Sequence, residues 1–172
     1  MQLKLILDKV LLGFDITVEH VGSTSIPGLC AKPILDIDIV LRTPANLNGV
    51  TAALEGIGYQ ARGEQGISGR FAFRQTDHTV PYTSHHQQWQ AHHLYVCLHN
   101  ALALKNHLLF KKALLADPAL VGRYADLKQV LINEQQRSRA AYNKLKTTFI
   151  LDVLKMQGMA DKELEEIRQA NE

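Results

Sequence analysis

The chain has 172 residues, of which 46% are hydrophobic and 21% charged, a composition typical of a soluble globular protein with a sizeable core. Its formal net charge of +2 is too small to argue for nucleic-acid binding, and no run approaches the roughly 20 apolar residues of a membrane span. The apolar N-terminus carries charges and no small-residue cleavage site, so we expect a cytoplasmic protein without a membrane partner.

The first 41 residues predict a helix, two strands and a loop. Apolar residues at helical spacing indicate an amphipathic helix over 2–12, and a short β-type run follows over 15–20. The segment 22–33 is rich in Gly, Ser, Thr and Pro, which predicts a loop or a very short helix. The run ILDIDIVL over 34–41 is the clearest strand in the sequence.

Residues 47–99 continue the mixed pattern. A second helix is predicted over 47–57, and strands over 59–61 and 70–75 flank a glycine-punctuated turn. The polar, His-rich segment 76–91 is expected to be irregular. Clean alternation over 93–99 predicts a further strand.

After residue 100 the periodicity becomes helical, over 102–116, 118–132 and 134–156, and the charged residues 159–172 suggest a solvated or frayed helix. The fold class is therefore α+β: a mixed sheet with flanking helices, followed by a C-terminal helical segment. We expect residues 1–100 to form the α/β core and residues 101–172 to pack on it as one compact unit.

Two aspartates stand on the strand 34–41. Side chains alternate along a strand, so Asp36 and Asp38 share one face while Ile37 and Ile39 face a core. Two neighbouring carboxylates repel each other, and a divalent cation with a preference for hard oxygen ligands relieves that repulsion. The pattern predicts a Mg²⁺ or Mn²⁺ site, and the alternative is a solvated strand face.

The loop before this strand contains Gly22, Ser23 and Thr24. Glycine lets the backbone approach a ligand closely, and successive backbone N–H groups at a turn can cradle phosphate. Ser23 is alternatively an ordinary N-cap. A strand, a Gly-Ser turn and then acid-hydrophobic-acid on the next strand form the pattern of the nucleotidyltransferase superfamily, with metal on the aspartates and triphosphate on the turn.

The amino-acid sequence resembles one family within that superfamily more closely than the superfamily pattern alone requires. The segment EHVGSTSIPGLCAKPILDIDIV over 19–40 resembles the GrpB-like family of that superfamily, and the resemblance continues in order through the rest of the chain. Its later matches are Gly63-Glu64, residues 66–70, Phe73-Arg74, residues 92–96, Pro118, Tyr124 with Lys128, and Tyr142 with Lys146. The resemblance implies a small nucleotidyltransferase-like domain with helices after it.

The family pattern leaves the third carboxylate of the superfamily unassigned. Active nucleotidyltransferases carry it on a later strand, but the strand 93–99 contains no acid. His93 on that strand could serve as base or metal ligand, and Glu64 on the glycine-rich turn is a second candidate.

Several basic residues are candidates for phosphate binding. Lys32 lies between the loop and the acidic strand, and Arg70 and Arg74 share a strand face from which they could neutralise a triphosphate or an anionic substrate. Lys128 and Lys146, each four residues after a tyrosine, could line a cleft from the helical side. For each of them the alternative is an ordinary solvated or packing side chain.

These residues predict a metal-dependent nucleotidyltransferase that moves an NMP from a nucleoside triphosphate to a small acceptor. The alternative is a catalytically degenerate module that binds a nucleotide or a phosphorylated metabolite, which the missing third acid would explain. A nucleic-acid acceptor is disfavoured because no basic stripe with interleaved aromatic residues is present.

Overall fold

The structure is a computed structural model that describes residues 2–85, 87–133 and 139–171, with side chains described for all of these except 131–133 and 139–142. The chain divides into two compact units, one made of Met1–Ser25 and Ala31–Leu104, the other of Ile26–Cys30 and Lys105–Glu172. The sequence predicted a division after residue 100 and did not foresee that the short segment 26–30 joins the helical unit.

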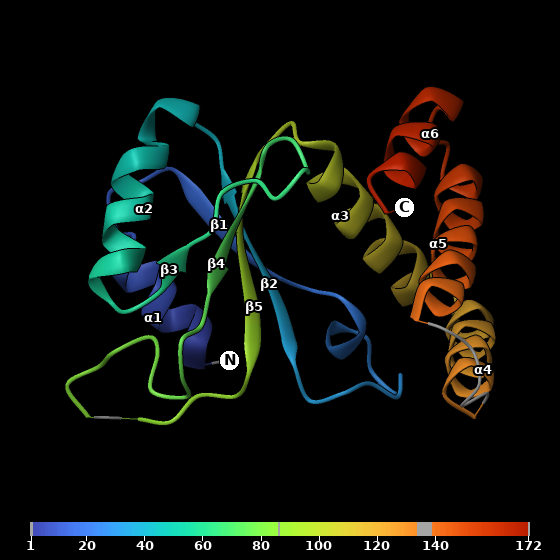
Figure 1. Ribbon diagram of the computed structural model, residues 1–172, viewed down its shortest axis with the longest axis horizontal. Helices are drawn as coiled ribbons and strands as arrows, with labels where there is room; N and C mark the ends of the chain where they lie inside the picture. Colours follow the sequence, from blue (N-terminus) through green and yellow to red (C-terminus); the bar gives the residue numbers. More distant parts are fainter. Residues whose placement is uncertain (1, 86, 134–138, 172) are drawn as a thin grey trace. The chain divides into compact units, whose positions relative to one another are not determined.

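The first unit is built on a five-stranded mixed sheet (Figure 1). Its strands lie in the order β1-β2-β5-β4-β3, in which β2 and β5 are parallel and the other neighbours antiparallel. The bounds of the strands are β1 Ile16–Val21, β2 Leu35–Leu41, β3 Gln60–Ala61, β4 Arg70–Arg74 and β5 His92–Leu98. Each strand falls within about one residue of its predicted position.

One face of the sheet is apolar and is covered by two helices, α1 (Gln2–Val10) and α2 (Leu47–Gly56), which Figure 1 shows on the same side of the strands. Leu7 of α1 and Leu54 of α2 are fully buried against Ile37 and Ile39 of β2. The predicted alternation of β2 is thereby confirmed, because its odd-numbered isoleucines enter the core and its aspartates face the other way.

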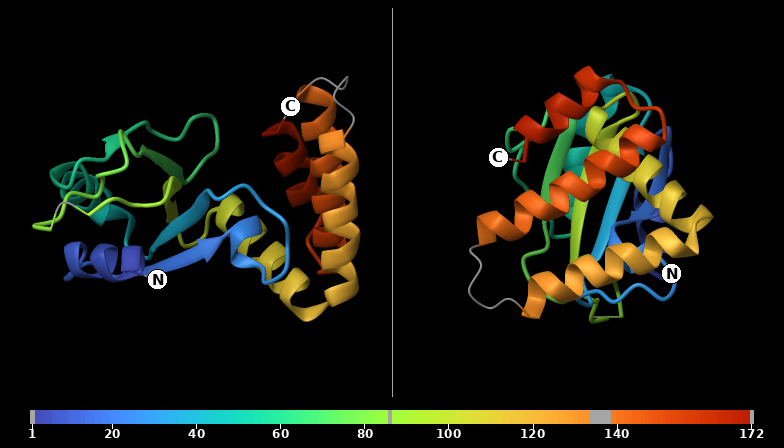
Figure 2. Two further views of the ribbon diagram at one scale, coloured as in Figure 1. Left: turned by 90° about the horizontal axis from the view of Figure 1, so that it is seen from below. Right: turned by 90° about the vertical axis from the view of Figure 1, so that its right-hand side faces the viewer.

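The second unit is helical. Its helices are α3 (Leu102–Ala116, whose first three residues belong to the first unit), α4 (Pro118–Asn133), α5 (Arg139–Met156) and α6 (Asp161–Gln169). Figure 2 shows α4, α5 and α6 side by side. The helix predicted over 134–156 corresponds to α5, and its predicted start at Glu134 lies outside the described residues. The side chain of Tyr142 also lies outside them. The charged tail is an ordered helix that buries Leu164 and Ile167.

Three aromatic rings form the centre of the helical unit. Tyr124 of α4 stacks on Phe149 of α5 with ring centroids 5.0 Å apart, and Phe110 of α3 meets both rings edge to face. Ile26 and Leu29, from the loop between β1 and β2, pack into this cluster. Their burial explains why residues 26–30 belong to the helical unit. No helix among the described residues is long and apolar enough to cross a lipid bilayer.

A buried polar pair lies at the start of β5. His92 Nε2 is 2.6 Å from the hydroxyl of Tyr59, and its Nδ1 is 2.8 Å from the carbonyl oxygen of Gln90. Only 4% of His92 is exposed, and burial lowers its pKa, although the bond to Gln90 acts in the opposite direction. The neutral ring, with its proton on Nδ1, satisfies both contacts because the tyrosine hydroxyl then donates to Nε2.

This pair predicts a pH-dependent loss of stability. Below a pH of about 6.5, His92 takes up a proton in the unfolded chain but stays neutral in the folded chain. The free energy of unfolding should therefore decrease as the pH is lowered through that range. In urea titrations between pH 7.5 and 5.5, His92→Gln should show a smaller fall than the unmodified chain.

The exposed residue His99 provides the matched control, since His99→Gln also removes one imidazole. The neighbouring His93 changes the pH dependence of stability in the opposite direction, because its pKa is raised in the folded chain. His93 is present in every variant of the comparison, so its contribution is common to all of them. An unchanged pH dependence in His92→Gln would contradict the assignment.

Candidate functional site

The face of the sheet opposite α1 and α2 carries the polar residues of the site. Strand register places them in two rows across the sheet, since residues directly opposite each other on neighbouring strands share a face. The first row is Val21, Asp36, His93 and Arg74, and the second is Glu19, Asp38, Tyr95 and Ala72. The carboxylates therefore lie on β1 and β2, whereas Arg74 lies on β4, two strands from β2.

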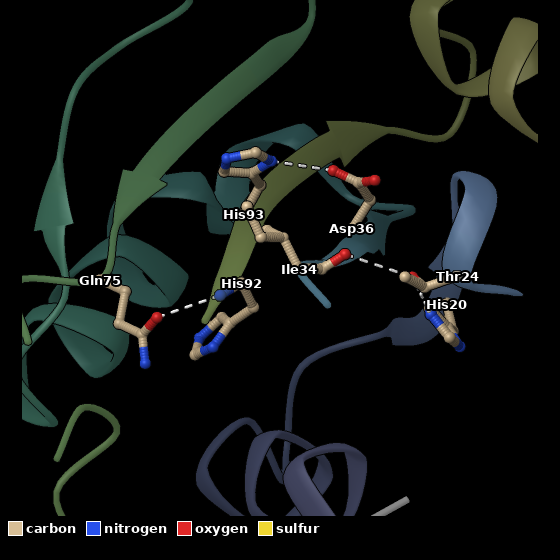
Figure 3. A network of polar contacts seen from close by, with 7 residues as sticks. All are labelled: His20, Thr24, Ile34, Asp36, Gln75, His92 and His93. Atoms are coloured by element: carbon tan, nitrogen blue, oxygen red, sulfur yellow. Dashed lines mark hydrogen bonds and ion pairs between the residues drawn. The ribbon is translucent and has the colours of Figure 1, made fainter. Parts of the chain in front are cut away.

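Asp36 is held between the glycine turn and the neighbouring strand. Its Oδ1 is 2.9 Å from Nδ1 of His93 (Figure 3). On its other side the carboxylate packs directly against Gly22, where an added Cβ would lie 2.9 Å from Cγ of Asp36 and closer still to Oδ2. Gly22 has φ +68, a conformation that side-chain-bearing residues rarely adopt. The turn thus needs glycine for its backbone and for the space that Asp36 occupies.

Asp38 is fully buried, with 0% of the residue exposed. The sequence alternative of a solvated strand face is therefore wrong for this residue. In addition to burial, its negative charge raises the pKa of two residues on β5, Cys97 and Tyr95. Burial raises the pKa of Cys97, and the charge of Asp38 and a hydrogen bond to it raise that pKa further. Burial also raises the pKa of Tyr95, with smaller contributions in the same direction from Asp36 and Asp38.

His93 extends the site from β2 onto β5. Its hydrogen bond to Asp36 raises its pKa, which burial only partly offsets. The side chain is 57% exposed, and Figure 3 shows the second ring nitrogen, Nε2, on the side of the ring away from Asp36. A histidine with a raised pKa and one accessible nitrogen is suited to exchange protons near neutral pH.

The turn residues are braced by local hydrogen bonds. His20 Nε2 lies 2.9 Å from the hydroxyl of Thr24, which itself donates to the carbonyl oxygen of Ile34 at 3.4 Å (Figure 3). The hydroxyl of Thr24 links His20 of β1 to the start of β2, and its contact with phosphate stays a prediction. Ser23 opens the short 3₁₀ helix Ser23–Ser25, and Lys32 is exposed in the loop before β2.

Glu64 does not join the aspartates. Its Oε1 accepts a hydrogen bond of 2.7 Å from the backbone N–H of Gly69, so the carboxylate stabilises the turn before β4. That turn meets β5 at its far end, where Leu98 N–H donates to the carbonyl oxygen of Gly69. Leu98 is five residues from His93, or about 16 Å along a strand.

Glu19 is the carboxylate that sequence reasoning missed. It lies directly opposite Asp38 on β1, on the same face of the sheet. Alternation with Ile16 and Val18, which face the core, could have placed it on the polar side of β1, but the pairing with Asp38 depends on a register that spans a 13-residue connection.

The remaining predicted residues belong to β4 and to the helical unit. Arg70 places its guanidinium carbon 4.5 Å from the ring centroid of Tyr95, a cation–π contact. Lys128 and Lys146 belong to the helical unit. Lys128 donates a hydrogen bond of 2.9 Å to the carbonyl oxygen of Cys30 and lies over the ring of Tyr124, and Lys146 is half-buried on α5. A role of either lysine in phosphate binding stays a prediction.

Comparison with known families decides the classification. Residues 2–156 match the family described as GrpB protein. The chain belongs to the GrpB family. It is 32% identical over 127 residues to the UPF0157 protein YqkA of Bacillus subtilis, covering 74% of this chain and 34% of that protein. It is 31% identical over 149 residues to the UPF0157 protein SCO7215 of Streptomyces coelicolor, covering 87% of this chain and 73% of that protein.

Solved structures place the GrpB chain in the nucleotidyltransferase-like fold. The crystal structure of the conserved protein GrpB from Enterococcus faecalis aligns with a TM-score of 0.70 and 29% identity, over 96% of this chain and 90% of that one. Cid1, solved in complex with its short product ApU, aligns with a TM-score of 0.51 and 16% identity, over 87% of this chain and 44% of Cid1. The resemblance predicted from residues 19–40 is confirmed for family and fold.

Proposed function

We propose that this GrpB chain is a metal-dependent nucleotidyltransferase, which moves an NMP from a nucleoside triphosphate to a small acceptor. One observation carries the proposal: Asp36 and Asp38 share a sheet face, and the carboxylate of Asp36 packs against a Gly22 turn that has room for nothing larger. In this fold, that arrangement brings a pair of carboxylates next to a turn whose backbone can approach a phosphate.

The donor set suits Mg²⁺ or Mn²⁺. Mg²⁺ is commonly bound by one or two carboxylates, with water and substrate phosphates completing the shell. Asp36 and Asp38 would supply the two carboxylates. No group of three or more His, Cys, Asp or Glu side chains able to hold a metal occurs in the described part of the chain, so the shell would be completed by the substrate. The ion would neutralise charge on the triphosphate.

The chain's own groups would handle the phosphates and the proton. Backbone N–H groups at Gly22 and Ser23 would contact the triphosphate, and Lys32, exposed on the loop that enters β2, is a further candidate for phosphate binding. The acceptor oxygen or nitrogen would bond to the α-phosphorus while the bond from that phosphorus to pyrophosphate breaks. The proton of the acceptor would pass to Nε2 of His93, whose Nδ1 is fixed by Asp36.

The strongest alternative is a nucleotide-binding module without catalysis. It is favoured by the residues of β5 that face the site, His93, Tyr95 and Cys97, none of which is a carboxylate. Such a module would use the same turn and the same aspartates but would bind its nucleotide without turning it over.

Two measurements on the full chain separate these functions. Calorimetric titration with ATP, GTP and CTP, with and without Mg²⁺, should show Mg²⁺-dependent binding of at least one nucleotide. Incubation of that nucleotide with a panel of small hydroxyl and amine acceptors should release pyrophosphate, and Asp36→Asn should abolish the release. Binding without release in any mixture would favour the module, and the absence of any nucleotide binding would overturn both functions.

A further inference from the structure

The basic half of the polar sheet face holds a cleft that the proposed nucleotide site does not use. The cleft has a volume of about 430 Å³ and lies entirely within the α/β unit. Ala72 of β4 forms its floor, with Arg62 and Gln65 on one side and His93 and Tyr95 on the other. This volume is within the range of about 300–1,000 Å³ typical of small-molecule sites.

Arg62 reaches this cleft because the pairing of β3 with β4 continues past the end of β3. Arg62 N–H donates to the carbonyl oxygen of Ala72 at 2.8 Å, and Ala72 N–H donates to that of Gly63 at 2.9 Å. Because Arg62 N–H bonds to Ala72 while Ala72 N–H bonds to Gly63, both Arg62 and Gly63 lie opposite Ala72 in a β-bulge. Arg62 lines the cleft together with Ala72 and Tyr95. The sequence missed Arg62 because the predicted strand ended at residue 61.

Two guanidinium groups, of Arg62 and Arg74, thus border a cleft floored by the smallest chiral side chain. Among the described residues neither forms an ion pair, whereas Arg42, at the end of β2, is paired with Asp15 at 3.2 Å. Like charges that share one sheet face repel each other, and an anion bound between them relieves that repulsion. Guanidinium groups bind carboxylate and phosphate oxygens through paired N–H donors.

The cleft adjoins the aspartate pair through His93. His93 lines the cleft and also bonds to Asp36. The floor, on β4, is two strands from β2, which is about 10 Å at the usual strand spacing. A small molecule whose anionic group contacts Arg62 and Arg74 would therefore place its other end beside His93 and the aspartates.

We propose that this cleft binds the acceptor, and that the acceptor is a small molecule carrying a phosphate or carboxylate group, which Arg62 and Arg74 hold. Arg74, for which the sequence predicts contact with either a triphosphate or an anionic substrate, is thereby assigned to the acceptor. The identification of the ligand as acceptor rests on the proposed function, whereas the binding of an anion in the cleft does not.

Inorganic phosphate is the probe that tests the anion site. Titrated into the full chain at constant ionic strength and followed by amide NMR, it should give saturable shifts at Ala72, Arg74 and Tyr95. Arg62→Gln should weaken this binding about tenfold, because a charge-assisted contact is lost. Arg123→Gln, which removes an exposed arginine from α4, should leave it within about twofold of the unmodified chain. Equal affinities in Arg62→Gln and the unmodified chain would overturn the anion site, as would shifts confined to the Gly22 turn.

Nucleotide titrations distinguish acceptor from triphosphate. Mg²⁺-dependent nucleotide affinity in Arg62→Gln should stay within about threefold of the unmodified chain, since the predicted triphosphate contacts lie on the Gly22 turn. A loss of nucleotide affinity as large as the loss of phosphate affinity would overturn the assignment to the acceptor. If the unmodified chain binds no nucleotide, the proposed function fails, while the phosphate titration still decides whether the cleft binds anions.

Discussion

Asp38→Asn is expected to lower the rate of nucleotidyl transfer about a thousandfold, because a lost metal ligand removes several kcal/mol of charge stabilisation and each 1.36 kcal/mol is a factor of ten. Asparagine preserves the shape of the side chain, removes the charge and replaces one acceptor oxygen with an N–H donor. Asp38 is the fully buried member of the aspartate pair. The measurement is pyrophosphate release with the nucleotide that binds in the presence of Mg²⁺.

Asp15→Asn is the matched control for this substitution. Asp15 precedes β1 in the same unit, is largely exposed and is paired with Arg42, so its loss should change turnover by less than about twofold. Thermal unfolding supplies a readout that needs no acceptor. At a nucleotide concentration one hundred times its Kd, the unmodified chain should gain about 2.7 kcal/mol with Mg²⁺ present. Asp38→Asn should lose most of that gain, and full turnover in this variant would refute the metal role of Asp38.

Gly22→Ala should destabilise the chain and weaken nucleotide binding together. A side chain at a positive φ costs about 1–2 kcal/mol, and displacement of the Asp36 carboxylate by the new methyl group should add about 1 kcal/mol or more. Once displaced, Asp36 can no longer hold its hydrogen bond to His93. Urea unfolding and calorimetry in the presence of Mg²⁺ measure the two effects.

Gly63→Ala is the control that separates the collision of the new methyl group with Asp36 from the cost of a positive φ. Gly63 has φ +69, nearly the same as Gly22, but an added Cβ there would meet no atom within 4 Å. Both variants should therefore incur the backbone cost, and only Gly22→Ala should lose Mg²⁺-dependent nucleotide affinity. Equal stability and equal affinity in the two variants would show that the contact between Gly22 and Asp36 is unimportant.

Local pattern was enough to predict the elements and the centre of the site. Alternation over ILDIDIVL put Ile37 and Ile39 into the core and Asp36 and Asp38 on the opposite face, because neighbouring side chains of a strand must point oppositely. The Gly-Ser turn followed by acid-hydrophobic-acid identified the nucleotidyltransferase-like fold, and the wording of residues 19–40 identified the GrpB family.

Strand register decided what these residues touch. His93 was one of two candidates for the third group, and only the parallel pairing of β2 with β5 put it beside Asp36 while Glu64 was used by its own turn. Neither Glu19 opposite Asp38 nor Arg62 beside the cleft could be placed in advance. Pairing between strands distant in the sequence depends on the packing of the whole sheet, which no short segment encodes.

The sequence by itself therefore determined which residue types face the site: two aspartates after a glycine turn, and arginines spaced along a later strand. The tertiary structure alone decided that acidic residues gather on β1 and β2 and arginines on the strands beyond β5, with His93 between them. The physical reason is that alternation fixes the face of a side chain within its own strand, while its neighbours across the sheet are fixed by strand order and register.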